Sequence, residues 1–286
     1  MSKLSVKNHD RDVAGYQYIY PVISRRSGGL SIGINFNTNN ACNWRCVYCQ
    51  VPDLTIGAAP ELDFDLLETE LEDFLRDVLQ GSFYERYQLE PEMRVIKDIA
   101  ISGNGEPTSV KDFTKAIALI TRVVGQAKIA EPFQYVLITN GSLLHKQDVQ
   151  AGLKLFNEFN GQVWFKLDSA SDVGRETINH SSVSVKRQLE NLISSTKLCF
   201  TWVQTCMLNY ADKEGVGLVS EGEQTAYLEL IEKVRQRASL QGVMLYSLAR
   251  RSLQPEASVI SGVTAEQINH FAERLRKSGL IVSVSL

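Results

Sequence analysis

Three of the five cysteines in this 286-residue chain lie close together, in the segment NNACNWRCVYCQ at residues 39–50. They are Cys42, Cys46 and Cys49, so the spacing is Cys-x3-Cys-x2-Cys. Thiolates grouped on one short segment are typical of metal binding rather than of disulfide bonds. The first question is therefore which metal group takes three thiolates from one segment.

Two metal groups can be compared on the spacing alone. A structural zinc ion normally takes four ligands, and none of the four histidines lies near the cysteines in sequence. A zinc site would then need a remote fourth ligand. An iron–sulfur cluster also takes four thiolates as a rule, but three thiolates leave one iron open, which suits direct coordination of a small molecule. The spacing favours an iron–sulfur cluster, and zinc stays open as the alternative.

The elements that position these cysteines follow from the hydrophobic pattern, which alternates short apolar runs with amphipathic stretches. Six strand–helix pairs are expected. The strands are predicted at residues 30–36, 95–102, 133–140, 163–168, 200–208 and 243–248. The helices are predicted at 62–79, 111–125, 146–157, 183–196 and 223–238, with a sixth opened by the capping-box sequence Thr264-Ala265-Glu266-Gln267.

Serial strand–helix pairs imply parallel strands joined by right-handed crossovers. The strands are nearly continuous in apolar residues, as expected when both faces of a sheet are covered. Six units are too few for a closed eight-fold barrel, so we predict an α/β fold with a partial (β/α)6 TIM-like barrel. We expect residues 280–286 (LIVSVSL) to add a last strand.

The domain organisation is predicted to be simple, because no linker, repeat or low-complexity tract divides the chain. Residues 1–29 are expected to form an irregular N-terminal extension, and residues 30–286 a single domain. Ligands of such sheets sit at the carboxyl ends of the strands. The cysteine segment follows the first predicted strand directly, so position and chemistry agree.

Composition narrows the class of protein further. Hydrophobic residues make up 44% and charged residues 22% of the chain, with a net charge of −3. Those values are typical of a globular protein and give no overall field that favours nucleic acid. The sequence has neither a long apolar run nor an N-terminal apolar leader, which predicts no membrane span and a cytoplasmic protein with reduced thiols.

With the strands placed, the sequence resembles the radical S-adenosylmethionine (radical SAM) superfamily over roughly residues 15 to 255. The cysteine triplet has an aromatic residue, Tyr48, before its last cysteine. The turn Ser102-Gly103-Asn104-Gly105-Glu106-Pro107-Thr108 after the second strand is similar to the glycine–glycine–glutamate turn with which that family binds the SAM amino group. Asn140-Gly141-Ser142 and Lys166-Leu167-Asp168-Ser169 fall where the family has further SAM contacts. Among its branches, the chain most resembles the wyosine-synthase-like one.

The resemblance implies a [4Fe–4S] cluster on Cys42, Cys46 and Cys49, with SAM chelating the fourth iron. It also implies a set of cofactor-binding residues, to which we add Gln204 because it is isolated in an apolar strand. The set is Tyr48, Gly103, Asn104, Gly105, Glu106, Asn140, Lys166, Asp168, Ser169 and Gln204.

Each of these positions also has a simpler interpretation. Tyr48 would otherwise be a shielding aromatic, the glycine turn a plain strand-to-helix turn, and Asp168 a helix cap. Lys166 and Asp168 share one face of their strand by alternation, and a buried lysine needs a partner such as Asp168 or the SAM carboxylate.

The chemistry implied is reductive cleavage of SAM by an electron from the cluster, giving methionine and a 5′-deoxyadenosyl radical that abstracts hydrogen from a substrate. Such a cluster is oxygen-sensitive and needs a reductant such as flavodoxin or ferredoxin. An RNA base is the leading substrate hypothesis, with a peptide or a small metabolite as alternatives. A non-catalytic zinc or iron–sulfur module, or a SAM sensor, is the competing class.

Three further pairs of residues complete the interpretation. Arg250-Arg251 after the sixth strand, and Arg25-Arg26 before the first, could clamp a substrate phosphate or carboxylate. Cys199 and Cys206 are seven positions apart, so in a regular strand they would face opposite sides and could not act as a pair. We predict that both are buried and behave as small hydrophobes. The chain therefore lacks the extra cysteines of a second cluster.

Overall fold

The computed structural model describes residues 14–24, 28–211, 213 and 216–286. A nine-stranded sheet runs through this part of the chain in the order β1-β2-β5-β6-β7-β8-β9-β11, with β10 paired to β8 outside this path. The strands are β1 (Ile19–Ser24), β2 (Gly29–Ile34), β5 (Ile96–Ile101), β6 (Gln134–Thr139), β7 (Gln162–Lys166), β8 (Phe200–Tyr210), β9 (Gly242–Ser247), β10 (Ile260–Gly262) and β11 (Val282–Ser285).

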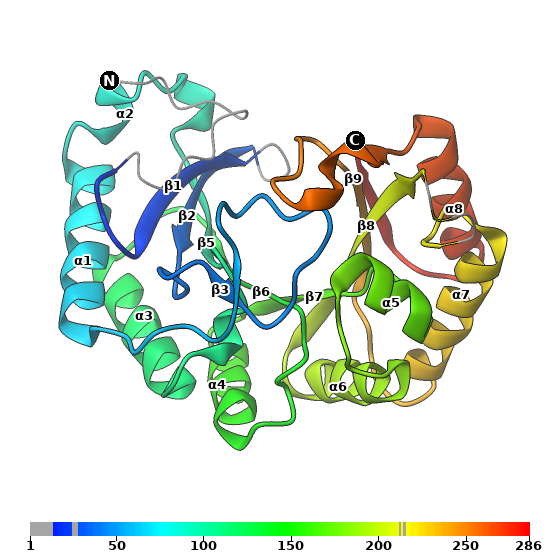
Figure 1. Cartoon of the computed structure of the whole chain (residues 1–286). Coiled ribbons are helices and arrows are strands. Elements are labelled where there is room, and N and C mark those ends of the chain that lie inside the picture. Colours follow the sequence, from blue (N-terminus) through cyan, green and yellow to red (C-terminus); the bar gives the residue numbers. More distant parts are fainter. Residues whose placement is uncertain (1–13, 25–27, 212, 214–215) are drawn as a thin grey trace.

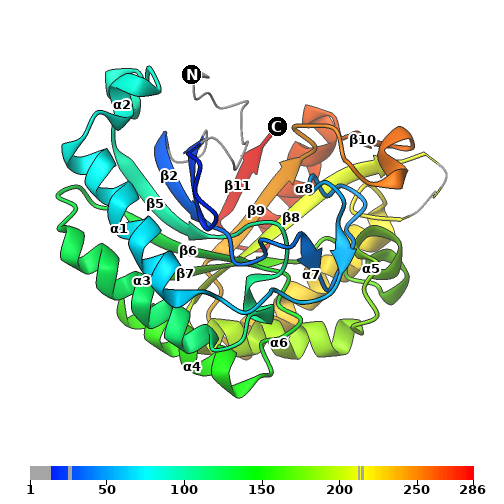
Figure 2. The same ribbon diagram turned by 60° about the vertical axis from the view of Figure 1, so that its left-hand side comes forward.

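Every pair from β2 to β11 along the path is parallel, as the alternating pattern predicted. The helices line the outer side of the curved sheet (Figures 1 and 2). They are α1 (Phe64–Gln80), α3 (Phe113–Ala127), α4 (Gln147–Glu158), α5 (Asp172–Asn179), α6 (Val185–Leu198), α7 (Glu221–Arg235) and α8 (Ala265–Lys277), with a short α2 (Phe83–Arg86). The chain thus has a mixed α/β fold with a largely parallel sheet.

The main core lies between the sheet and this helical layer. On β7, for example, Val163 and Phe165 are fully buried and belong to the same apolar cluster as Phe156 of α4. Strand alternation therefore turns Trp164 and Lys166 to the concave side of the sheet. Each strand thereby buries one face against helices and offers the other to the interior of the curve.

Helix starts follow the local sequence closely. Thr264 and Gln267 form the predicted capping box at the start of α8. Such caps satisfy N–H groups that have no partner inside the helix, so they fix where each helix leaves its strand.

The structure differs from the sequence predictions in three places. Ile19–Ser24 forms β1, antiparallel to β2, where an irregular extension was expected. Pro21 obscured this strand, although proline is tolerated on an edge strand. Helix α5 and a two-residue pairing of β3 (Ala41–Cys42) with β4 (Thr55–Ile56) were not predicted. The last predicted strand is confirmed as β11, whereas Arg25 and Arg26 lie outside the described residues.

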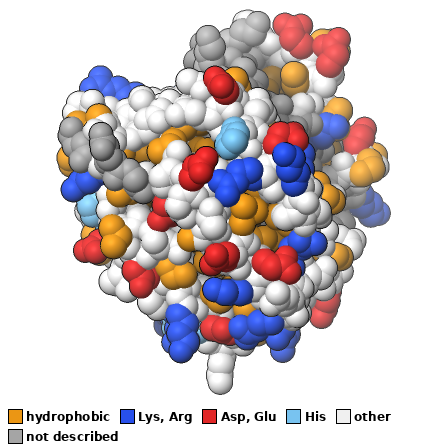
Figure 3. All heavy atoms as spheres, turned by 90° about the vertical axis from the view of Figure 1, so that its right-hand side faces the viewer, with side chains coloured by type: hydrophobic (Ala, Val, Ile, Leu, Met, Phe, Trp, Pro, Cys, Tyr) orange, Lys and Arg blue, Asp and Glu red, His pale blue; other side chains and the backbone are white. Residues whose placement is uncertain are grey.

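The surface over α7 and α8 does not carry charge of a single sign. Over α7 and α8, the described side chains of both signs are interspersed with apolar ones (Figure 3). This agrees with the small net charge of −3. None of the described helices has the length and apolarity needed to cross a membrane.

Candidate functional site

The cysteine loop, residues 39–50, lies beside the carboxyl ends of the parallel strands. The end of α5 holds its centre through main-chain hydrogen bonds. Val47 N–H donates to the Ile178 carbonyl at 2.8 Å, and Arg45 N–H donates to the Asn179 carbonyl at 3.2 Å. Helix α5, which was not predicted, is thus the element on which the cysteine loop packs.

The segment after β9 holds the second half of the loop. Ser252 donates through Oγ to the Val47 carbonyl at 2.7 Å, and Leu253 N–H donates to the Cys49 carbonyl at 3.0 Å. In the same segment, Glu256 accepts two hydrogen bonds from the Arg45 guanidinium, both at 2.7 Å. Two sequence-distant segments therefore fix the loop.

The glycine turn after β5 packs directly on the start of the cysteine loop. A Cβ added to Gly105 would lie 2.0 Å from the Ala41 carbonyl oxygen, and one added to Gly103 would lie 2.1 Å from Asn35 Oδ1. Neither contact is possible for a larger residue. Asn104 strengthens the junction by donating through Nδ2 to Asn40 Oδ1 at 2.6 Å. The glycines thus permit close approach between the turn and the loop.

Glu106 is turned into the protein and joins the glycine turn to β6. One carboxylate oxygen accepts from the Thr108 hydroxyl at 2.5 Å and the Thr139 hydroxyl at 2.6 Å, and the other accepts from Asn140 N–H at 2.6 Å. Only 2% of Glu106 is exposed. Its side chain therefore organises the turn instead of projecting from it.

Asn140 connects the end of β6 with the cysteine loop. Its Nδ2 donates to Asn43 Oδ1 at 2.8 Å, and Asn43 Nδ2 donates to Ser142 Oγ at 2.7 Å. Gln188 of α6 fixes the main chain of Asn140 by donating to its carbonyl at 2.7 Å. Asn43 and Gln188 were not predicted as site residues.

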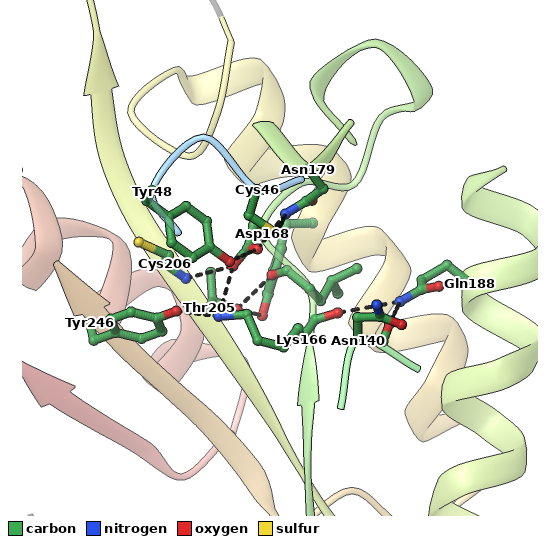
Figure 4. A network of polar contacts seen from close by, with 12 residues as sticks. Cys46, Tyr48, Asn140, Lys166, Asp168, Asn179, Gln188, Thr205, Cys206 and Tyr246 are labelled. Carbon is green, nitrogen blue, oxygen red and sulfur yellow. Dashed lines mark hydrogen bonds and ion pairs between the residues drawn. The ribbon is translucent and has the colours of Figure 1, made fainter. Parts of the chain in front are cut away.

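Asp168 is the centre of a buried polar network, shown in Figure 4. Its carboxylate accepts from Tyr48 OH at 2.5 Å, from Asn179 Nδ2 at 2.8 Å and from Cys206 N–H at 2.8 Å. Lys166 Nζ lies 3.9 Å away, and only 1% of Asp168 is exposed. This carboxylate thus holds together the cysteine loop, α5, β7 and β8.

Lys166 lies between two aromatic rings on the concave side. Its ammonium is 4.9 Å from the centroid of Tyr48 and 4.8 Å from that of Tyr246, and it donates to the Tyr246 hydroxyl. Burial alone lowers the pKa of Lys166, but Asp168 and Tyr246 outweigh it and raise that pKa above its ordinary value. Lys166 is therefore a fixed positive charge suited to binding a carboxylate, rather than an amine nucleophile.

The three thiols influence one another. Burial, followed by the charge of Asp168, raises the pKa of Cys46 to about 12, and burial also raises the pKa of Cys42, to which Cys46 and Cys49 both add. Among the described residues, no three His, Cys, Asp or Glu side chains are grouped so that they could hold one metal ion. Thiols of high pKa are unreactive as they stand, whereas a coordinating metal deprotonates them outright.

Two hydrogen bonds reach the thiols from nitrogen donors. Trp44 N–H donates to Cys42 Sγ at 3.5 Å, and Asn179 Nδ2 donates to Cys46 Sγ at 3.3 Å. Donors of this kind favour sulfur in its charged, metal-binding form. The donor set therefore fits a group that takes thiolates.

Two further predicted cofactor residues, Ser169 and Gln204, differ in their surroundings. Ser169 is fully buried and its hydroxyl donates to Glu223 of α7 at 2.8 Å, so its side chain is engaged in helix packing. Gln204 lies opposite Lys166 in the register of β7 and β8, on the concave side. It is 5% exposed, and its side chain makes no hydrogen bond within the described part of the chain.

The remaining sequence candidates differ in how they lie relative to the Asp168 network. Arg250 and Arg251 line a surface pocket with Ser252 and Gly262, outside the Asp168 network. Cys199 is the C-cap of α6 and is buried in the main core, as predicted. Cys206 is also buried, but it lies on the concave side with Tyr48 and Tyr246 around it.

No protein-family model matches the chain. A protein named GTPase Obg from Brachyspira hyodysenteriae is 30% identical over 133 residues, which is 46% of this chain but only 17% of that protein. The chain thus spans less than a fifth of this relative, and it contains no Gly-Lys pair and hence no P-loop sequence. UPF0026 protein slr1464 from Synechocystis is 23% identical over 223 residues, 76% of this chain and 71% of that protein.

Solved structures with a similar fold include two radical SAM enzymes. TYW1 with a lysine–pyruvate adduct bound has a TM-score of 0.54 at 15% identity, covering 88% of this chain and 74% of that one. The anSMEcpe enzyme with bound AdoMet and a Kp18Cys peptide has a TM-score of 0.52 at 13% identity, covering 89% and 63%. The chain therefore shares the fold of these two proteins, which supports the predicted relationship at the level of fold alone.

Proposed function

We propose that this chain is a radical SAM enzyme in which Cys42, Cys46 and Cys49 hold a [4Fe–4S] cluster. One observation carries the proposal: a single loop, held by main-chain hydrogen bonds at the carboxyl edge of a parallel sheet, carries three thiols, and two of them, Cys42 and Cys46, accept hydrogen bonds from nitrogen donors. The domain of residues 30–286 would then be a partial (β/α)6 barrel whose concave side receives the cofactor. The fold shared with TYW1 and anSMEcpe supports this assignment.

When bound, the cluster with SAM would supply an electron and a 5′-deoxyadenosyl radical that abstracts hydrogen. The residues of this chain prepare the site for that chemistry. Lys166 presents a fixed positive charge for the SAM carboxylate. Gln204, with its unpaired amide on the same face, is a further contact for the cofactor.

Other residues hold this arrangement in place without needing to touch the cofactor. Asp168 orients the Tyr48 ring over Lys166. Glu106 fixes the position of Gly103, Asn104 and Gly105 relative to Asn140. Because these groups are buried and mutually hydrogen-bonded, they are preorganised, and little reorganisation is needed when a cofactor enters.

The proposed substrate is an RNA base, which the fold shared with the wyosine synthase TYW1 supports. A peptide is the alternative that the peptide-bound anSMEcpe structure suggests, and a small metabolite is the third. The proposed reductant is a flavodoxin or ferredoxin, and the proposed compartment is the cytoplasm. Arg250 and Arg251 are kept as candidate contacts for an anionic substrate group.

The test is anaerobic reconstitution with iron and sulfide, followed by metal analysis and electron paramagnetic resonance with and without SAM. We expect iron and sulfide in the ratio of a [4Fe–4S] cluster, and a spectrum that changes when SAM is added. Cys46→Ala should lose the cluster, whereas Cys199→Ala, the same change at a buried thiol outside the loop, should retain it. Bound zinc without iron, or full iron in Cys46→Ala, would contradict the proposal.

A further inference from the structure

Helix α5 (Asp172–Asn179) presents two fully buried polar residues to the cysteine loop. Arg175 and Asn179 are four positions apart, and therefore lie on one face of the helix. Both also contain a buried polar atom without a hydrogen-bond partner in the described structure, Nη1 of Arg175 and Oδ1 of Asn179. Buried polar groups are costly to leave unpaired, so this face is expected to have a role beyond packing.

The orientation of the Asn179 amide is determined by its surroundings. Asp168 Oδ2 lies 2.8 Å from one end of the amide and, as a carboxylate oxygen, can only accept. That end must therefore be the NH2 group, and its nitrogen also lies 3.3 Å from Cys46 Sγ. Figure 4 shows Asn179 directed at both groups. Asp168 thus fixes an N–H donor on the sulfur of Cys46.

Arg175 adds positive charge to the same place. Its guanidinium lies 5.1 Å from the ring of Trp44, within the cysteine loop, and donates to the Val183 carbonyl at 3.2 Å. Burial lowers the pKa of Arg175 to about 10, against the opposing effects of Asp168 and Cys46. The group is therefore still charged at neutral pH.

We propose that α5 raises the reduction potential of the cluster, Asn179 by donating a hydrogen bond to Cys46 and Arg175 by placing a positive charge beside the loop. This inference rests on the proposed function. Reduction adds one electron from a donor such as dithionite, changing the cluster from 2+ to 1+, and no bond in the protein forms or breaks. The reduced cluster carries more negative charge, so N–H donors and cations near its sulfur ligands stabilise it.

Asn179 and Asp168 contribute to this effect in different ways. Asn179 acts on a ligand atom directly, and Asp168 acts through Asn179 by fixing the amide. The same Asp168 carboxylate holds Tyr48, one of the two residues between Cys46 and Cys49. Asp168 therefore contacts both the cysteine loop and the donor that acts on Cys46.

The experiment is a redox titration of the reconstituted protein, followed by electron paramagnetic resonance. Asn179→Leu removes the donor while keeping a similar volume. We expect about a tenfold lower ratio of reduced to oxidised cluster at a fixed potential, which is about 59 mV for one electron. Arg175→Met should shift the potential in the same direction. Asn209→Leu is the matched control, because Asn209 donates to the Gly262 carbonyl at 3.0 Å, away from the thiols, and it should leave the potential unchanged.

The outcomes separate this inference from the proposed function. Wild-type potential in both the Asn179→Leu and the Arg175→Met proteins, with intact clusters, would overturn the inference and leave the enzyme assignment standing. Wild-type protein that assembles no cluster would overturn the proposed function and this inference with it. If Asn179→Leu does not fold, Asn179→Ser gives the same test, since its shorter side chain cannot span both Asp168 and Cys46.

Discussion

Replacing Asp168 with alanine should destabilise the protein strongly even without a cofactor, because Asp168 is the shared acceptor of the site. The substitution removes the acceptor of Tyr48 OH, of the Asn179 amide and of Cys206 N–H. It also removes the nearest negative charge to Lys166, whose side chain is 14% exposed. Three donors would lose this acceptor and Lys166 would lose its nearest carboxylate, although the Asn179 amide would keep Cys46 Sγ and Lys166 would keep the Tyr246 hydroxyl.

The magnitude follows from these contacts. At 3.9 Å, the attraction between Lys166 and Asp168 is about 4 kcal/mol at an effective dielectric constant of about 20. Removing one partner of a buried charged pair costs about 3–5 kcal/mol, because the other charge is left uncompensated. We therefore expect Asp168→Ala to lower the free energy of unfolding by about 3–5 kcal/mol.

The assay is urea unfolding of the apoprotein, with Asp73→Ala as the matched control. Asp73 pairs with Arg76 at 2.8 Å, but it is 46% exposed, so its loss should cost less than about 1 kcal/mol. A shift of the urea midpoint at unchanged slope measures the difference. If Asp168→Ala cost no more than Asp73→Ala, the network would not be a stabilising centre, and the reasoning would be refuted.

Three further predictions concern the elements around the loop. Gly105→Ala should reduce iron incorporation severalfold at unchanged helical content, because its Cβ would collide with the Ala41 carbonyl; full incorporation would contradict that contact. Glu106→Gln should lower the free energy of unfolding by a few kcal/mol and with it the melting temperature. The new NH2 group replaces either the oxygen that accepts from Asn140 N–H or the oxygen that accepts from the Thr139 hydroxyl. An unchanged melting temperature would argue against this role of Glu106. The hydrogen bonds from Arg45 lower the pKa of Glu256 from its ordinary value of 4.5 to about 2. Ionised Glu256 therefore stabilises the fold fully above pH 4.5, and this stabilisation is lost as the pH falls toward 2. Glu256→Gln should therefore show less acid destabilisation between these pH values, measured by circular dichroism, than wild type.

Much of the fold could be predicted because its signals are local. Strand alternation, helical spacing and the Thr264 capping box each depend on a few neighbouring residues. Helix α5 escaped prediction because it is short and contains Gly174. That glycine is required by a close contact, since a Cβ there would lie 2.1 Å from Ser169 Oγ, in the turn that leads into the helix. The helical pattern alone does not reveal this contact.

The site could be predicted in outline but not in its connections. The spacing of the cysteines predicted the metal-binding loop, and strand alternation placed Lys166 and Asp168 on one face. The structure brings both residues beside Tyr48 of that loop. The sequence could not show that Asp168 would accept a hydrogen bond from Asn179, or that Ser169 would donate one to Glu223. Those partners come from segments brought together only by the fold, so no residue spacing reveals them.

The central claim is tested most directly by incubating the reconstituted protein anaerobically with SAM and dithionite. The account predicts that 5′-deoxyadenosine and methionine form, and that Cys46→Ala forms neither while Cys199→Ala forms both. Detection by liquid chromatography and mass spectrometry makes the result unambiguous. A wild-type protein that carries a cluster and binds SAM, yet releases no 5′-deoxyadenosine with any of the three substrate classes, would contradict the claim that this chain is a radical SAM enzyme.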